Sequence, residues 1–227
     1  MTTHAADQIT AEIGWVGDQT RALAQRYEGV FASLREALRS ELAACDSLAD
    51  GALAAMGLAD AAADAFQTSL PNQPARDCRA GCDACCHLPV MVPPGVAEAI
   101  AGHLVRILAP DALESLKVEL ERAAGHGEGP MSVPRRRRCV FLTEEGRCSI
   151  YAVRPPTCRA FTSASAAACR TMVHDPGGGV AAIPQNPSHY RLYVEVTAAL
   201  EQAARARGLS DRQTGLAAGV LAALGAA

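Results

Sequence analysis

The chain contains one short run that holds four cysteines, Cys78-Arg-Ala-Gly-Cys82-Asp-Ala-Cys85-Cys86, and His87 follows it directly. Four more cysteines follow singly, at Cys139, Cys148, Cys158 and Cys169. Thiols at this density are explained by disulfides, by a bound metal or by a reactive thiol. Eight thiols in one region argue against a single nucleophile, so disulfides and metal remain.

The composition helps to choose between these two. Hydrophobic residues make up 49% of the chain and aromatic ones only 4%, which favours helices packed through small side chains. A net charge of −3 argues against a nucleic-acid partner. The first ten residues lack the features of a secretory signal, and the apolar run 216–227 is too short to span a membrane. We therefore expect a cytoplasmic protein with no membrane partner, in which clustered thiols bind metal.

Residues 1–70 are predicted to form a helical hairpin. Apolar side chains recur there at steps of three and four residues, at Leu23, Tyr27, Val30, Leu34, Leu38, Leu42 and Cys45. A break is expected near Asp50-Gly51. Cys45 continues the apolar stripe and is interpreted as a small core residue. Pro71-Asn-Gln-Pro74 ends this region and opens a cysteine-rich metal-binding domain, residues 71–170.

The fold class expected for the whole chain is mainly α with a small β-hairpin. Helices are predicted from Pro93-Pro94 to about Leu108 and over 112–124, the latter capped by Asp111. Two apolar runs around Gly146, within residues 139–151, predict the β-hairpin, with a cysteine in each arm. Residues 171–227 are expected to add helices over 193–206 and 210–224, the last one capped by Ser210.

Thiolates are soft ligands that suit zinc, copper(I) and iron–sulfur clusters. A zinc site with four cysteines is usually built from two pairs of cysteines two residues apart, and only Cys82 and Cys85 form such a pair. Three nearby cysteines plus one distant thiolate are a common way to hold a 4Fe–4S cluster, which we favour, with zinc as the alternative. The triad spacing also matches radical S-adenosylmethionine enzymes, but the downstream region is too short and too helical for their barrel.

Adjacent cysteines point in different directions, so Cys85 and Cys86 are expected to face different centres. The sequence-based partition places Cys158 with Cys78, Cys82 and Cys85, and leaves a second centre for Cys86, Cys139, Cys148 and Cys169. His87, His174 and His189 are further candidates for a mixed thiolate–imidazole site.

Arginines surround the cysteines. Arg135 to Arg138 precede Cys139 and fit either donors to the sulfurs or a solvated loop. Arg154 and Arg159 stand in a rigid Pro-Pro bend, and we expect them to contact the bound cofactor, because a centre with four thiolates is anionic.

These motifs resemble the YkgJ-like cysteine-cluster family, named for a CxxCxxCC pattern and described as zinc- or iron-chelating. The match rests on Cys78-Arg-Ala-Gly-Cys82-Asp-Ala-Cys85-Cys86 and on the later residues Cys139, Gly146, Cys148, Tyr151, Arg154, Pro155, Cys158 and Arg159. It covers roughly residues 75–165. The opening interval of three residues rather than two, and the additional Cys169, depart from the pattern. A similar motif in flagellin lysine N-methylase implies an iron–sulfur cluster, although this chain has no glycine-rich loop to hold S-adenosylmethionine.

The sequence thus predicts a protein that binds a metal ion or cluster and leaves three roles open. The first is a redox or modifying enzyme acting at iron. The second is a zinc module in which the metal mainly stabilises the fold, and the third is metal buffering or delivery. Neither a substrate nor a protein partner is indicated.

Overall fold

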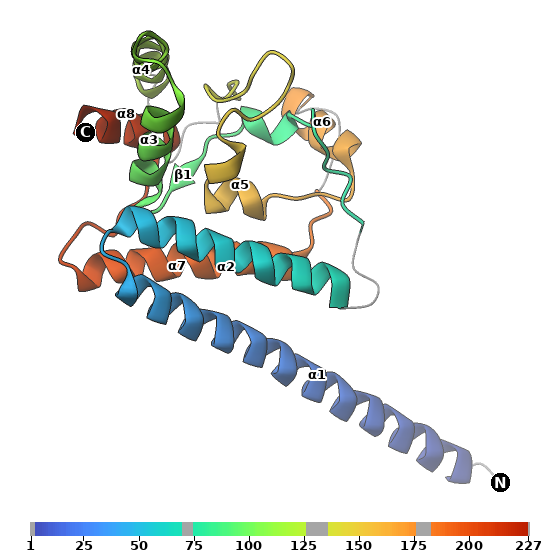
Figure 1. The fold of residues 1–227 in the computed structure, drawn as a ribbon. Helices are drawn as coiled ribbons and strands as arrows, with labels where there is room; N and C mark the ends of the chain where they lie inside the picture. Colours follow the sequence, from blue (N-terminus) through green and yellow to red (C-terminus); the bar gives the residue numbers. More distant parts are fainter. Residues whose placement is uncertain (1–2, 70–74, 126–135, 176–182, 227) are drawn as a thin grey trace.

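The computed structural model describes residues 3–69, 75–125, 136–175 and 183–226. The predicted boundary Pro71–Pro74 and Arg135 lie outside the described residues. Three long helices, α1 (Thr3–Ala44), α2 (Leu48–Ser69) and α7 (Pro187–Ala206), pack against one another. In Figure 1, α2 and α7 lie between α1 on one side and the cysteine-rich segment on the other. The fold is mainly α, as predicted.

The hairpin of α1 and α2 turns earlier than the sequence indicated. The Ser47 hydroxyl caps α2 by accepting the N–H of Asp50 at 3.1 Å, so the break falls at residues 45–47. Gly51 lies inside α2, where its missing side chain lets Leu42 approach: a Cβ there would lie 2.7 Å from Leu42 Cδ2. The predicted break at Asp50-Gly51 was therefore wrong, because the glycine serves close helix packing.

The predicted apolar stripe of α1 is buried in its C-terminal half, whereas Tyr27 is half-buried and the side chain of Leu23 lies outside what the structure describes. Leu34, Leu38 and Leu42 are buried, but Val30 is 46% exposed and Phe31 takes its place at 1%. Cys45 is half-buried just after the end of α1. Within α7, Leu192, Val196 and Leu200 are fully buried against the same core.

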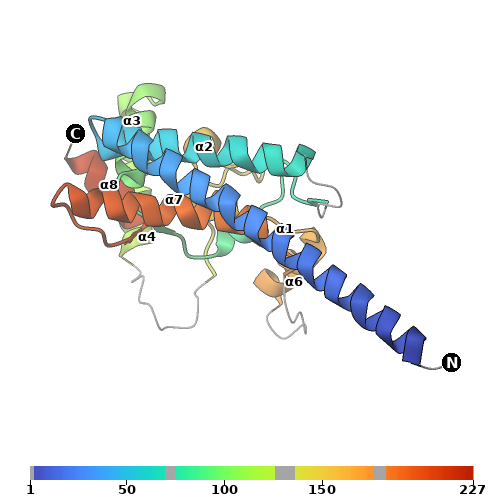
Figure 2. The same cartoon turned by 90° about the horizontal axis from the view of Figure 1, so that it is seen from below.

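A second group of helices closes one end of this layer. It comprises α3 (Val96–Ile107), α4 (Pro110–Ala124) and α8 (Leu216–Gly225), which contact one another (Figure 2). The predicted helix after Pro93-Pro94 is confirmed. Asp111 lies in the first turn of α4 rather than at its cap, because Pro110 takes the first helical position. Ser210 does not cap α8, which begins after a short strand.

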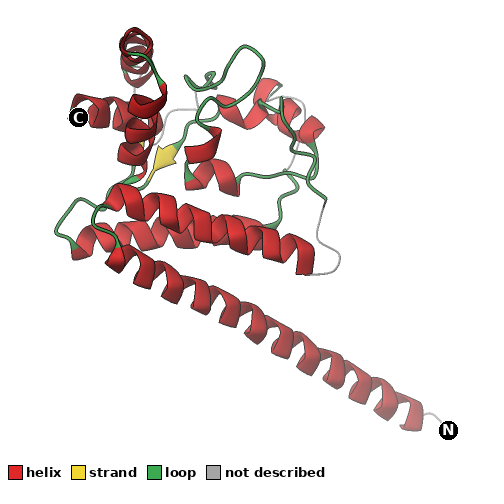
Figure 3. Ribbon diagram, viewed as in Figure 1, coloured by secondary structure: helices red, strands yellow, loops and turns green. Residues whose placement is uncertain are grey.

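The small sheet is not where the sequence placed it. Strand β1 (Met91–Val92), the yellow arrow in Figure 3, pairs antiparallel with β2 (Thr214–Gly215), which directly precedes α8 in the chain. The arms of the predicted hairpin at 139–151 meet in one antiparallel bridge, Leu142 to Cys148, around a turn at Gly146 with φ of 72°. No described helix is long and apolar enough to cross a membrane.

Candidate metal centre

The cysteine run folds as one tight turn followed by the short 3-10 helix η1 (Ala84–His87). The amide of Cys82 donates to the Arg79 carbonyl at 2.9 Å, a turn that uses Gly81 at φ of 83°. The amide of Cys139 donates to the Cys86 carbonyl at 2.7 Å. This bond places the start of the 139–151 loop directly beside η1.

The 139–151 loop presents one thiol from each arm. The amide of Ser149 donates to the Phe141 carbonyl at 2.8 Å and holds the arms together. Burial raises the pKa of the Cys139 thiol and of the Cys148 thiol. The backbone amides of Phe141 and Ile150 hydrogen-bond these two sulfurs respectively and oppose that rise in pKa. Amide donors aimed at a sulfur stabilise its thiolate form, which is the form that binds metal.

Cys158 is carried by α5 (Pro156–Ala160), and the neighbouring Arg159 fixes that helix. The Arg159 guanidinium is buried, forms an ion pair with Asp60 of α2, and donates to the carbonyls of Ala152 and Arg154 at 2.8 Å each. Tyr193 of α7 donates to the same Asp60 carboxylate at 2.7 Å. This network docks α5 on the α2–α7 layer, so Arg159 positions Cys158 through the backbone.

Four thiols are electrostatic neighbours, and we call Cys85, Cys139, Cys148 and Cys158 the inner group. Burial raises the pKa of Cys158 to about 12, and Cys139, Cys85 and Cys148 add to that rise. Burial is likewise the main cause of the raised pKa of Cys139, followed by Cys148 and Cys85 among its thiol neighbours. For Cys85, the hydrogen bond with Cys86 comes first, and burial second, in raising the pKa.

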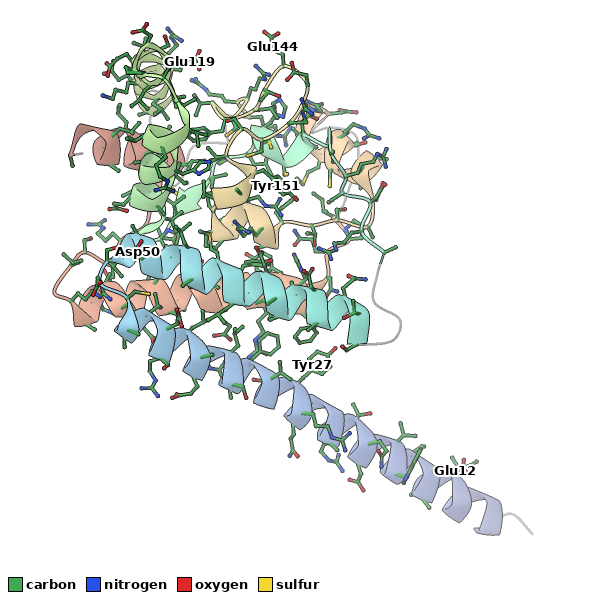
Figure 4. All side chains as sticks on the ribbon, in the orientation of Figure 1. Glu12, Tyr27, Asp50, Glu119, Glu144 and Tyr151 are labelled. Atoms are coloured by element: carbon green, nitrogen blue, oxygen red, sulfur yellow. The ribbon has the colours of Figure 1, made fainter. Side chains whose placement is uncertain are left out.

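The Arg154 guanidinium lies among these thiols. It opposes the rise in pKa that burial causes at Cys148 and Cys158. Its Cζ lies 4.3 Å from the centre of the Tyr151 ring, the residue labelled near α5 in Figure 4. The Nε of Arg154 is buried and has no hydrogen-bond partner. A buried donor without an acceptor costs about 1–3 kcal/mol, so this atom indicates that an acceptor belongs beside it.

An anionic centre supplies such an acceptor. Four thiolates around a divalent ion, or around a 4Fe–4S core of charge +2, carry a net charge of −2 that a neighbouring guanidinium stabilises. The donor set is soft and its amide bonds are directed at sulfur, as zinc and iron–sulfur sites require. The residues of the inner group therefore fit the metal that the sequence predicts.

The outer group comprises Cys78, Cys82 and Cys169. Burial raises the pKa of Cys78, and Cys82, Cys85 and Cys169 are the thiols that add to the rise. The Cys78 sulfur accepts the amide of Ser163 at 3.3 Å. Cys169 is buried on α6 (Ala166–His174) against Ala84 of η1. Sequence reasoning missed the Ser163 amide, since a backbone donor leaves no signal in residue type.

Two predicted histidines meet beside the outer group. The rings of His87 and His174 lie 5.1 Å apart, edge to face, where η1 contacts α6. The Nδ1 of His87 lies 3.2 Å from the Asp83 carbonyl. His189 lies elsewhere, buried at the start of α7 against the Arg159 carbonyl, with Nε2 at 3.0 Å.

The electrostatic neighbours of the thiols suggest another grouping than the sequence-based partition, which stays a prediction. Cys158 has Cys139, Cys85 and Cys148 as its thiol neighbours, whereas Cys78 has Cys82, Cys85 and Cys169. Cys85 is common to both sets and lies between them. Within the described ranges, no three His, Cys, Asp or Glu side chains converge so as to hold a metal ion. The inner thiols are neighbours rather than a closed coordination sphere.

Comparison with known proteins gives one match. Residues 77–175 match a family model described as "CxxCxxCC: Putative zinc- or iron-chelating domain". The matched segment contains the inner group, the outer group and Cys86, and it also contains Arg154 and Arg159. Neither the curated proteins nor the solved structures contain a match to this chain.

Proposed function

We propose that residues 77–175, which match the CxxCxxCC family model, bind iron as a 4Fe–4S cluster ligated by the inner group. The family description supports metal binding, by zinc or by iron. The finer assignment rests on the Arg154 Nε, which is buried and lacks a partner, and on the guanidinium's place beside three of the inner thiols, Cys85, Cys148 and Cys158. Cys86 and the outer group are then available for a second centre.

The spacing of the ligands favours iron over zinc. Only Cys82 and Cys85 have the spacing of a zinc knuckle, so the sequence offers no second knuckle to complete a paired zinc site. The inner thiols come from three separate segments: η1, the 139–151 loop and α5. The resemblance to flagellin lysine N-methylase adds an iron–sulfur precedent for this motif.

Four thiolates leave no open coordination position, which points to electron carriage or structural support rather than to activation of a substrate. Two surface hollows agree with this view. One lies between α1 and α7, where Tyr27 and Arg191 line it, and the other lies between α3 and α4, where Leu104 and Leu116 line it. Neither is lined by a cysteine.

Serine variants test the ligand set. We expect C158S and C139S to lose most of their iron and acid-labile sulfide after anaerobic purification, because each removes one of four ligands. C45S is the matched control, since Cys45 lies in the α1–α2 turn and should keep wild-type iron. C78S distinguishes the groupings: it keeps the inner cluster in this proposal and loses it in the sequence-based partition. Zinc without sulfide in the wild type, lost in C158S, would instead assign the inner group to zinc.

A further inference from the structure

The N-terminal part of α1 extends well beyond the helices that cover the rest of it. Figures 1 and 2 both show this part running past the ends of α2 and α7. Ile9, Ile13 and Val16 are 57%, 68% and 54% exposed there. Large aliphatic side chains at such exposure on one side of a helix mark an interaction surface rather than ordinary scatter.

These side chains continue the stripe that forms the core. Steps of four and three residues connect Ile9, Ile13, Val16, Thr20, Leu23 and Tyr27. The same side of α1 then continues through Phe31, Leu34 and Leu38, which α2 and α7 bury. A strict alternation of four and three is the signature of a coiled-coil seam. The seam is covered from Phe31 onwards, half-covered at Tyr27 and uncovered at Ile9, Ile13 and Val16.

The uncovered part is a weak helix by itself. Gly14 and Gly17 interrupt it, and each costs about 1 kcal/mol relative to alanine. Isolated helices of this length are marginal in water even without glycine. A partner helix on the seam would both bury the apolar side chains and support the helical conformation.

We propose that the partner is a second copy of this chain, and that the two protruding segments of α1 pack antiparallel into a short coiled coil. Charge at the edge of the seam argues for this occupant and this direction. Glu12, Gln19 and Arg26 flank the seam on one side, seven residues apart. In an antiparallel pair centred on Gln19, Glu12 of each copy faces Arg26 of the other, so two opposite-charge pairs form.

The apolar layers of the same arrangement also match. Ile9 faces Tyr27 of the other copy, and Val16 faces Thr20. On the other edge, Gly17 faces Gly17, which allows the backbones to approach closely. The hollow between α1 and α7, lined by Ala24, Tyr27 and Arg191, lies at the end of the seam that receives Ile9 (Figure 4 labels Glu12 and Tyr27). A parallel pair would place Glu12 opposite Gly17 and form no charge pair.

Sedimentation equilibrium of the full, metal-loaded chain tests this proposal. We expect a concentration-dependent mass that approaches twice the chain mass of 23.6 kDa. E12R and R26E should each weaken the dimer roughly tenfold or more, since two attractive pairs become repulsive. The double variant E12R/R26E should recover wild-type association. D18R is the matched control, because Asp18 lies outside the seam and the charge change is the same.

The outcomes are decisive. A monomer at all concentrations would overturn the proposal, as would a dimer that E12R, R26E and I13D leave unchanged. Failure of the double variant to recover association would overturn the antiparallel register. Iron content and thermal unfolding are measured for every variant, and wild-type values establish that each variant folds. This inference is independent of which metal the cysteines hold.

Discussion

Arg154 combines a half-buried cation, a buried Nε without a partner and three neighbouring thiols, Cys85, Cys148 and Cys158, so its contribution to stability should depend on the metal. In the metal-free chain the thiols are largely protonated, because burial raises the pKa of Cys158, Cys139 and Cys148. The Arg154 guanidinium then has no neighbouring thiolate whose attraction would offset the free-energy cost of removing it from water. Once four thiolates bind metal, the same group faces a net negative charge.

We therefore predict that R154M does not destabilise the metal-free protein but weakens metal retention in the loaded protein. The metal-free variant should melt at the same temperature as wild type or higher, since a donor costing about 1–3 kcal/mol is removed. The loaded variant should lose iron to a chelator several-fold faster. R137M is the control, because that side chain is exposed. Destabilisation of equal size in both states would show that Arg154 acts only by packing.

The residue types of the site could be predicted from the sequence, whereas their grouping could not. Clustered cysteines and a Pro-Pro bend with Arg154 and Arg159 are visible in one dimension. Which thiols face one another depends on the bond between Cys139 and Cys86 and on the docking of α5 through Asp60. Those contacts join residues far apart in the sequence, and no local pattern specifies them.

At the scale of elements, the start of α3 shows how tightly the helices approach. Gly95 precedes α3 at φ of 84°, and a Cβ there would collide with the backbone carbonyl of Leu48 at the start of α2. Both the left-handed conformation and the contact require glycine. The helix itself was predictable from Pro93-Pro94, but the contact was not, because it depends on where α2 begins.

We predict that G95A lowers the free energy of unfolding by at least about 2 kcal/mol, because backbone atoms cannot move aside as a side chain can. G57A is the matched control: Gly57 lies within α2 and a Cβ there meets nothing within 4 Å. That variant should be neutral or stabilised by up to about 1 kcal/mol. Chemical denaturation monitored by circular dichroism measures both, and equal effects would contradict the steric argument.

The junction of α5 with α7 should make stability depend on pH. Burial lowers the pKa of His189, and the hydrogen bond to the Arg159 carbonyl opposes this shift only in part. The unfolded chain therefore takes up a proton near pH 6.5 while the folded chain does not. The stabilisation is present above pH 6.5 and is lost as the pH falls from there towards the folded pKa.

We predict that H189Q, which keeps an N–H donor for the Arg159 carbonyl, loses stability less steeply than wild type below pH 6.5. The difference in slope should be at most about 1.4 kcal/mol per pH unit, the value for one proton. Unfolding of the metal-free proteins at a series of pH values measures it without competition from metal release. Parallel curves would show that His189 titrates alike in both states.

For the whole molecule, the large core and the contact between η1 and α6 are unequally supported. One cluster of buried residues extends through α1, α2, α3, α7 and α8, whereas the contact of η1 with α6 has only Ala84, Cys169 and Val173 as its buried residues. So small an apolar contact cannot hold two segments together by itself. The helical architecture was predictable from apolar periodicity, but this imbalance required the three-dimensional packing.

Removal of the metal should consequently open one part of the molecule. We predict that chelation increases amide hydrogen exchange by at least about tenfold in residues 78–88, which carry the inner ligand Cys85, while α2 and α7 keep their protection. The free energy of metal binding, on the order of 10 kcal/mol for structural sites, then stabilises only the segments around the metal. Uniform loss of protection across the chain would show that the metal supports the whole fold.

The central claim is that the inner group holds an iron–sulfur cluster, and the most direct test is chemical analysis of the wild-type chain. Iron, zinc and acid-labile sulfide should be determined per chain after anaerobic purification. The account predicts iron and sulfide in equal amounts, about four of each for one 4Fe–4S cluster, and more of both if a second centre is filled. One or two zinc ions per chain with no sulfide would contradict it.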